Sequence, residues 1–134
     1  MNRSDKRIEI VSYDGPGYQP LVDYGAWRAA VLNDDPATYH RDTLCQAERH
    51  METDEVFILL SGKCTLLIGD AKGNEPGPGK LSAVEMEPGK FYNIKKAVWH
   101  NLLTEKDTRL VIVENADTSR DNSEYCPVTP EMLP

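Results

Sequence analysis

The stretch ERHMETDEVFILLSGK, residues 48–63, says more about the fold than any other part of the chain. It reads as the end of one strand, a short polar turn and a second, apolar strand. Glu48 and His50 lie two residues apart and so share one face of the first strand, and Glu55 opens the second. The stretch therefore gathers three side chains of the metal-binding type.

The face of the first strand that carries Glu48 also carries Gln46. Periodicity alone allows this face to point either into the core or into solvent. The residue pattern of the second strand favours the core. Glu55 begins a face that Phe57 and Leu59 continue, which is typical of a polar site set into a hydrophobic pocket. We therefore predict a small substrate pocket lined by Gln46, Phe57 and Leu59.

A second informative stretch is GKFYNIKKAVWH, residues 89–100, which ends in a histidine at the start of a later strand. His100 supplies a fourth ligand if a barrel brings the two stretches together. Nitrogen and oxygen sets of this kind hold Zn, Fe, Mn and Ni. The candidate ligands of one divalent ion (Fe, Mn, Ni or Zn) are therefore Glu48, His50, Glu55 and His100.

The rest of the chain consists largely of short runs that alternate with period two between Gly, Pro, Asn and Asp, which is typical of an all-β protein. Residues 56–60 and 110–113 are apolar on both faces, so we expect central strands covered by a second layer. Ser61-Gly62-Lys63 has the composition of a tight hairpin turn, and antiparallel strands joined by such turns predict a sandwich or barrel. The expected strands cover residues 7–13, 24–33, 43–50, 55–60, 63–68, 81–86, 91–95, 99–104 and 108–114.

The chain has the length of one domain, spanning residues 1–134. We divide it into N-terminal strands (7–33), a barrel core (43–114) and a C-terminal tail (115–134). The tail loses the strand pattern and is expected to lie against the surface. The segment 69–80 is rich in Gly and Pro, so we expect an exposed hairpin tip without a role at the site.

The composition excludes several classes of partner. The formal net charge of −7 repels phosphate backbones and anionic membranes, so neither nucleic acid nor a membrane is expected to bind. We find no apolar run of membrane-spanning length, and residues 1–7 do not read as a signal peptide. Cys45, Cys64 and Cys126 are irregularly spaced, which fits reduced thiols in a cytoplasmic protein better than a disulfide framework.

The spacing of His50, Glu55 and Gly62, H-x4-E-x6-G, resembles the first sequence motif of the cupins, and Gly89 with His100 resembles the second. The resemblance implies a double-stranded β-helix, or jelly-roll, barrel in which His50, Glu55 and His100 are metal ligands. The chain looks most like the small single-domain bacterial cupins, a group of uncharacterised function. Cupins of this size often pair, so the resemblance also implies a homodimer.

The sequence departs from the cupin motifs at several positions. Glu48 stands where the first motif has a histidine, and a carboxylate can replace a histidine on a hard or borderline cation. The resemblance carries Glu48 over by position alone: it binds the metal directly, through water, or not at all. In the second motif, Lys95 and Ala97 replace Pro and Gly, and Thr104 replaces Asn.

These features predict an enzyme that uses its metal as a Lewis acid on a small polar metabolite, a sugar or a hydroxy or keto acid. Isomerase, epimerase and lyase chemistry fit, with Glu48 as the catalytic base if it is not a ligand. A metal-dependent dioxygenase is compatible with the same residues. The alternative is a ligand-binding or sensory cupin without turnover.

Overall fold

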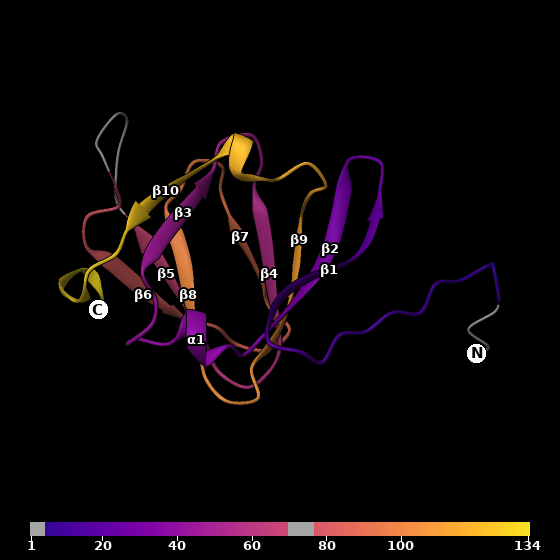
Figure 1. Cartoon of the computed structure of the whole chain (residues 1–134), viewed down its shortest axis with the longest axis horizontal. Helices are drawn as coiled ribbons and strands as arrows, with labels where there is room; N and C mark the ends of the chain where they lie inside the picture. The colour runs from indigo at the N-terminus through magenta and orange to yellow at the C-terminus, as the bar shows by residue number, and fades with distance from the viewer. Residues whose placement is uncertain (1–4, 70–76) are drawn as a thin grey trace.

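The computed structural model describes residues 5–69 and 77–134, and most of its regular structure is antiparallel strand (Figure 1). In the described part of the chain, no helix is both long enough and apolar enough to cross a membrane. The elements are β1 (Gly17–Tyr24), β2 (Trp27–Asn33), α1 (Pro36–Tyr39), β3 (Gln46–His50), β4 (Glu55–Ser61), β5 (Cys64–Gly69), β6 (Leu81–Glu85), β7 (Phe91–Ile94), β8 (His100–Thr104), β9 (Arg109–Asn115), the 3-10 turn η1 (Arg120–Asn122), β10 (Ser123–Pro127) and the 3-10 turn η2 (Pro130–Met132).

Two five-stranded sheets form a barrel of the jelly-roll type, which confirms the predicted all-β class (Figure 1). One sheet has the order β1-β2-β9-β4-β7 and the other β10-β3-β8-β5-β6. β3 and β4 follow each other in the chain but lie in different sheets. The short turn between them therefore brings the end of β3 and the start of β4 together, and the ring of His50 comes to lie 3.2 Å from the carboxylate of Glu55.

Apolar side chains from both sheets fill the barrel. On β4, the side chains of Phe57 and Leu59 are 3% and 1% exposed. Side chains alternate along a strand, so Leu60 lies on the other face, where it is 52% exposed. The expectation of a second layer covering all of 56–60 is therefore wrong at Leu60. The core cluster consists of Ala30, Leu32, Phe57, Leu59, Cys64, Leu66, Met86, Ile94, Leu102, Leu110 and Ile112.

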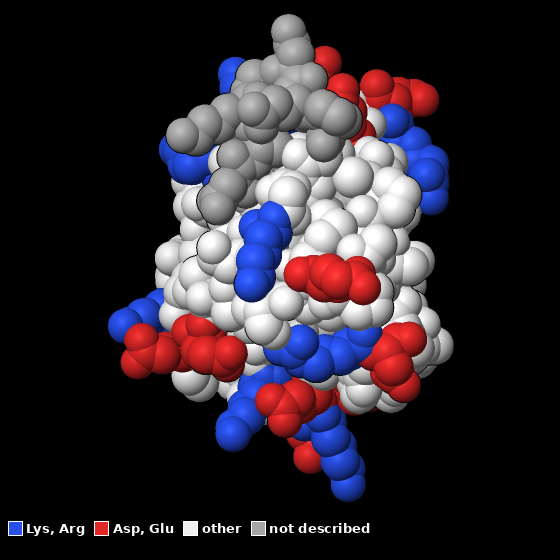
Figure 2. Space-filling view, turned by 90° about the vertical axis from the view of Figure 1, so that its left-hand side faces the viewer, with Lys and Arg blue, Asp and Glu red and all other residues white. Residues whose placement is uncertain are grey.

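A second apolar cluster includes Trp99 and involves the C-terminal tail, whose Val128 is buried in it and whose Met132 and Leu133 pack against it. Figure 2 shows this side of the molecule, where uncharged side chains occupy much of the middle of the face. The guanidinium of Arg49 lies 4.7 Å from the centre of the Trp99 ring. The tail thus lies against the surface as expected, but the sequence reading missed that it contributes a strand: β10 pairs with β3.

The turn at Gly62 does not close the hairpin that its composition predicts. β4 and β5 lie in different sheets, so the chain crosses from one sheet to the other here. Gly62 has a φ of +77°, and a Cβ at this position would run into the backbone of Thr108. A glycine is needed here because the backbone is left-handed and packs closely against another segment. A glycine in a hairpin turn looks the same in the sequence, so the sequence cannot distinguish a hairpin from a crossing between sheets.

The N-terminal region also differs from its prediction. Residues 7–13 form no strand, and the first strand of the barrel is β1, whose hairpin with β2 turns at Gly25 and Ala26. The strand expected over 24–33 therefore begins only at Trp27. At the other predicted hairpin, Gly69 pairs with Leu81, so β5 and β6 are joined as expected. Residues 70–76 of that hairpin tip lie outside the described residues.

Candidate metal centre

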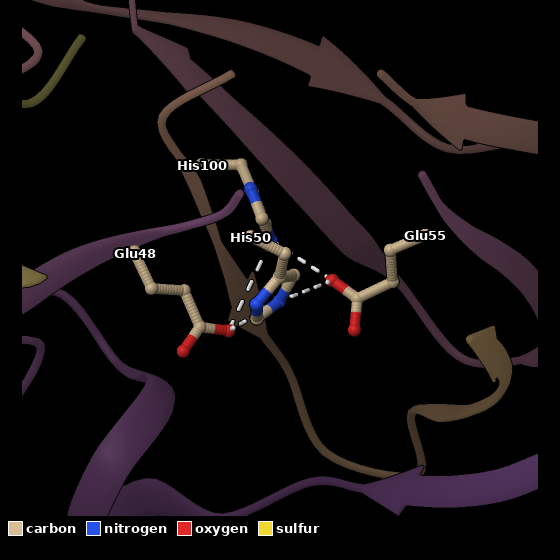
Figure 3. A group of neighbouring side chains, drawn as sticks. All are labelled: Glu48, His50, Glu55 and His100. Atoms are coloured by element: carbon tan, nitrogen blue, oxygen red, sulfur yellow. Dashed lines mark hydrogen bonds and ion pairs between the residues drawn. The ribbon is translucent and has the colours of Figure 1, made fainter. Parts of the chain in front are cut away.

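The four residues singled out as candidate ligands lie together inside the barrel (Figure 3). Glu48 and His50 come from β3, Glu55 from the first position of β4, and His100 from the first position of β8. Glu48 and His100 face each other across the pairing of β3 with β8, and the turn between β3 and β4 brings in Glu55 from the other sheet. One ligand atom from each residue lies within 4.8 Å of all the others.

The separations of these atoms suit a shared cation. Glu55 Oε1 lies 2.9 Å from His100 Nε2 and 3.2 Å from His50 Nε2. Glu48 Oε1 lies 3.7 Å from His50 Nε2 and 3.9 Å from His100 Nε2. Ligand atoms that bind one ion at 2.0–2.2 Å stand roughly 3 to 3.5 Å apart, so small movements are enough to enclose an ion.

The Nδ1 atoms of both imidazoles contact other groups of the protein. His100 Nδ1 donates to the carbonyl of Val98 at 2.9 Å, and a carbonyl can only accept, so this nitrogen carries a proton. His50 Nδ1 lies 2.8 Å from the hydroxyl of Ser123 on β10. Such contacts hold the ring orientation and, at His100, make Nε2 the nitrogen that faces the candidate site.

Burial and charge act in opposite directions on the two candidate carboxylates, Glu55 and Glu48. Burial raises the pKa of Glu55, but hydrogen bonds to His100 and His50 outweigh it and hold this pKa far below its ordinary value. Burial also raises the pKa of Glu48, and there the attraction of His100 is not enough to reverse the effect. Glu55 is thus the firmly ionised member of the pair. Glu48 is looser, with a side chain 31% exposed against 6% for Glu55.

Behind Glu55 lies a polar network that the sequence reading missed. Glu114 on β9 hydrogen-bonds Glu55, and its own Oε1 accepts from Tyr18 at 2.8 Å and from Arg28 at 2.9 Å. Burial, followed by the contact with Glu55, raises the pKa of Glu114 to about 7. The period-two alternation of β9 was the available signal, because it places Glu114 on the same inner face as Leu110 and Ile112.

Arg28 extends this network to the chain that covers the site. Its guanidinium also donates to the carbonyls of Ala116 (3.1 Å) and Thr118 (2.9 Å), just before η1 and β10. Ser119, Ser123 and Tyr125 of this covering segment line the cavity next to the four candidate ligands. The tail, which lacks strand pattern in the sequence, therefore contributes to the wall of the site.

The cavity beside the four candidate ligands has a volume of about 270 Å³. Phe57 lines this cavity, whereas Gln46 and Leu59 are not part of its described wall, and Leu59 belongs to the core cluster. Most of the cavity wall was not predicted from the sequence, because the residues of the wall come from distant segments of the chain. The wall consists of Tyr18, Arg28, Leu32, Tyr39, Glu48, His50, Glu55, Phe57, His100, Asn101, Leu102, Ile112, Glu114, Thr118, Ser119, Ser123 and Tyr125.

Comparison with known proteins finds no matching family model and no matching curated protein. Solved structures do match over most of the chain. A cupin-2 domain containing protein from Shewanella frigidimarina is 16% identical, with 77% of this chain and 84% of that chain covered and a TM-score of 0.55. KdgF from Halomonas is 11% identical, covering 78% and 79%, with a TM-score of 0.54.

A third similar structure is that of Pac13 from Streptomyces, described as a nucleoside dehydratase. It is 7% identical, with 88% of this chain and 86% of that chain covered and a TM-score of 0.58. At these identities the likeness concerns the fold alone. The chain therefore has the barrel fold of these cupin-type structures, which is the fold that its motif spacing predicts.

Proposed function

We propose that this cupin-type barrel binds one divalent metal ion through His50, His100 and Glu55, with Glu48 as either a fourth ligand or the general base, and acts on a small polar metabolite in the adjoining cavity. The observation that carries the proposal is the convergence of four ligand atoms within 4.8 Å at the wall of a cavity. Two imidazole nitrogens and two carboxylate oxygens form a donor set that suits Fe, Mn, Ni or Zn.

The cavity supports a small, oxygen-rich substrate. Its volume of about 270 Å³ corresponds to about nine water molecules at their share of liquid volume. Its wall combines apolar residues, such as Phe57 and Ile112, with the phenols of Tyr18, Tyr39 and Tyr125. A sugar or a hydroxy or keto acid fits such a wall, and the similar structure of a nucleoside dehydratase supports chemistry on a sugar-like group.

A bound divalent ion supplies a Lewis acid that polarises a substrate oxygen. Glu48 then has the position of a general base, because it faces the cavity and stands farther from both imidazoles than Glu55 does. Glu55 and the two histidines hold the ion in place, and the covering segment limits access of water. This arrangement suits proton abstraction in an isomerase, epimerase or lyase, and dioxygenase chemistry is the less favoured variant.

Replacing Glu48 with Gln separates its two possible roles. If Glu48 is the base, metal content stays at one ion per chain, while turnover falls by about 10²- to 10⁴-fold, the usual contribution of general base catalysis. If it is a ligand, metal affinity falls instead. Metal analysis, together with thermal shift and turnover assays on sugars, nucleosides and hydroxy and keto acids, measures both. Glu52→Gln, at an exposed carboxylate in the adjoining turn, is the matched control.

The same assays decide between the enzyme and a ligand-binding or sensory cupin. The relevant observation is that Glu48 already lies within 4 Å of both imidazoles, so an ion that recruits it as a fourth ligand leaves the cavity without its base. Ligand-induced stabilisation without product formation, for every compound that binds, supports the binding protein. Product formation by the parental protein supports the enzyme.

We also propose that the protein is a homodimer. The extended arm before β1 exposes apolar side chains, with Ile8 at 47% and Ile10 at 52% exposed, and runs away from its own barrel in Figure 1. Trp27, Leu60 and Phe91 on the sheet that contains β1 are 46%, 52% and 75% exposed. A second copy of the chain offers both an apolar arm and an apolar sheet to cover these surfaces.

Light scattering on a sizing column tests the dimer. We expect a dimer for the parental protein and a monomer for Ile10→Asp combined with Phe91→Asp, because a charge in an apolar interface carries a large desolvation penalty. Val84→Asp is the control, since Val84 is a partly exposed apolar residue of the other sheet. A parental monomer contradicts the proposal.

The three cysteines are free thiols, which supports a reducing, cytoplasmic location.

A further inference from the structure

Three tyrosines line the cavity, and they differ in what their hydroxyl groups contact. The hydroxyl of Tyr18 donates to Glu114 at 2.8 Å. The ring of Tyr125 lies under the guanidinium of Arg120, 4.8 Å from the ring centre. For Tyr39, we find no hydrogen-bond partner of the hydroxyl among residues 5–69 and 77–134. Tyr39 is therefore a phenol of this wall that is free to bind a ligand.

The ring of Tyr39 is held firmly although its hydroxyl is free. It is the last residue of α1, and its backbone N–H donates to the carbonyl of Asp35 at 2.8 Å. The next residue, His40, is fixed by a 2.8 Å contact with Asp34, which also accepts from Thr104. The Tyr39 ring packs against both apolar clusters of the protein. A side chain held in this way loses little further entropy on binding a ligand.

The electrostatic surroundings keep Tyr39 a hydrogen-bond donor. Burial, and then the negative charges of Glu48, Asp35 and Glu55, raise its pKa to about 12. The phenol thus keeps its proton at physiological pH, and the influence of Glu48 and Glu55 reflects their closeness in the same cavity. A protonated phenol donates to hydroxyl, carbonyl or negatively charged oxygens.

We infer that Tyr39 binds the substrate of this cavity by donating a hydrogen bond from Oη to a substrate oxygen. This inference rests on the proposed metal-dependent function and deepens it. The substrate must then carry an acceptor oxygen within reach of Tyr39 as well as an oxygen for the ion. Hydroxy ketones, hydroxy acids and sugars with neighbouring oxygens meet this requirement, whereas a compound with a single oxygen does not.

The test compares Tyr39→Phe, which removes only the hydroxyl, with the parental protein after loading with Co²⁺. The probe is acetohydroxamate, a small metal chelator with two neighbouring oxygens, and its binding is followed by the visible absorption of Co²⁺. Tyr92→Phe is the matched control, because Tyr92 is also partly buried against the core but lies outside the described cavity wall. Thermal melts of all three proteins check that they fold equally well.

We expect equal Co²⁺ uptake by all three proteins and a Kd for acetohydroxamate about tenfold higher in Tyr39→Phe, the usual effect of losing one hydrogen bond to a charged group. Tyr92→Phe keeps the parental Kd. A parental Kd in Tyr39→Phe overturns the inference while leaving the metal site intact, and so does a Co²⁺-loaded parental protein that does not bind acetohydroxamate. Failure of the parental protein to take up Co²⁺ overturns the proposed function itself, and this inference with it.

Discussion

Replacing His100 with Ala is expected to lower the affinity for a divalent metal by more than 100-fold. His100 is 2% exposed, and its Nε2 stands 2.9 Å from Glu55, the most buried of the candidate carboxylates. Its removal takes away a nitrogen ligand and leaves two carboxylates facing each other across the gap. Losing even an outer partner of a ligand commonly costs 10- to 100-fold in affinity, so loss of the ligand itself costs more.

His50→Ala is expected to behave in the same way, because the two imidazoles present their Nε2 atoms to the same carboxylate oxygen. Metal content after dialysis and a competition titration with a chromophoric chelator measure the effect. His40→Ala is the matched control, since the third histidine pairs with Asp34 outside the cluster. Full metal occupancy in both the His50 and the His100 variant contradicts the assignment of the site.

Leu59→Ala is expected to reduce the free energy of unfolding by about 2 to 5 kcal/mol, the range seen for deletion of a large buried side chain. Leu59 is 1% exposed and packs in the core cluster between the sheets. It is also absent from the described cavity wall, so this variant separates stability from ligand binding. Urea denaturation in the presence of a chelator measures the change without any contribution from bound metal.

Leu60→Ala provides the control on the same strand. Leu60 is 52% exposed, and we expect a change within about 0.5 kcal/mol, as for most surface substitutions. Ile58 is partly buried, and its truncation should fall between the two rather than match Leu59. A loss below about 0.5 kcal/mol at Leu59 contradicts the assignment of this face of β4 to the core.

Much of the candidate metal centre was predictable because its residues lie close together in the sequence. Period-two alternation placed Glu48 and His50 on one face, and a short turn placed Glu55 next to them. His100 required the additional resemblance to the cupins, since fifty residues separate it from His50. Glu114 and Tyr39 were missed because β9 reads as an ordinary apolar strand and residues 36–39 read as a loop.

The sequence by itself determined the all-β class, the inward face of β4 and the residue types of the candidate metal centre, because alternation and turn spacing are local properties of the chain. Tertiary structure alone decided which strands are partners. Gly62 marks a turn whether the next strand pairs with β4 or, as here, crosses to the other sheet. Tertiary structure also decided which residues form the cavity wall, because the tail covers the site only when β10 pairs with β3. Such pairings depend on burial between segments far apart in the chain, and no local pattern encodes them.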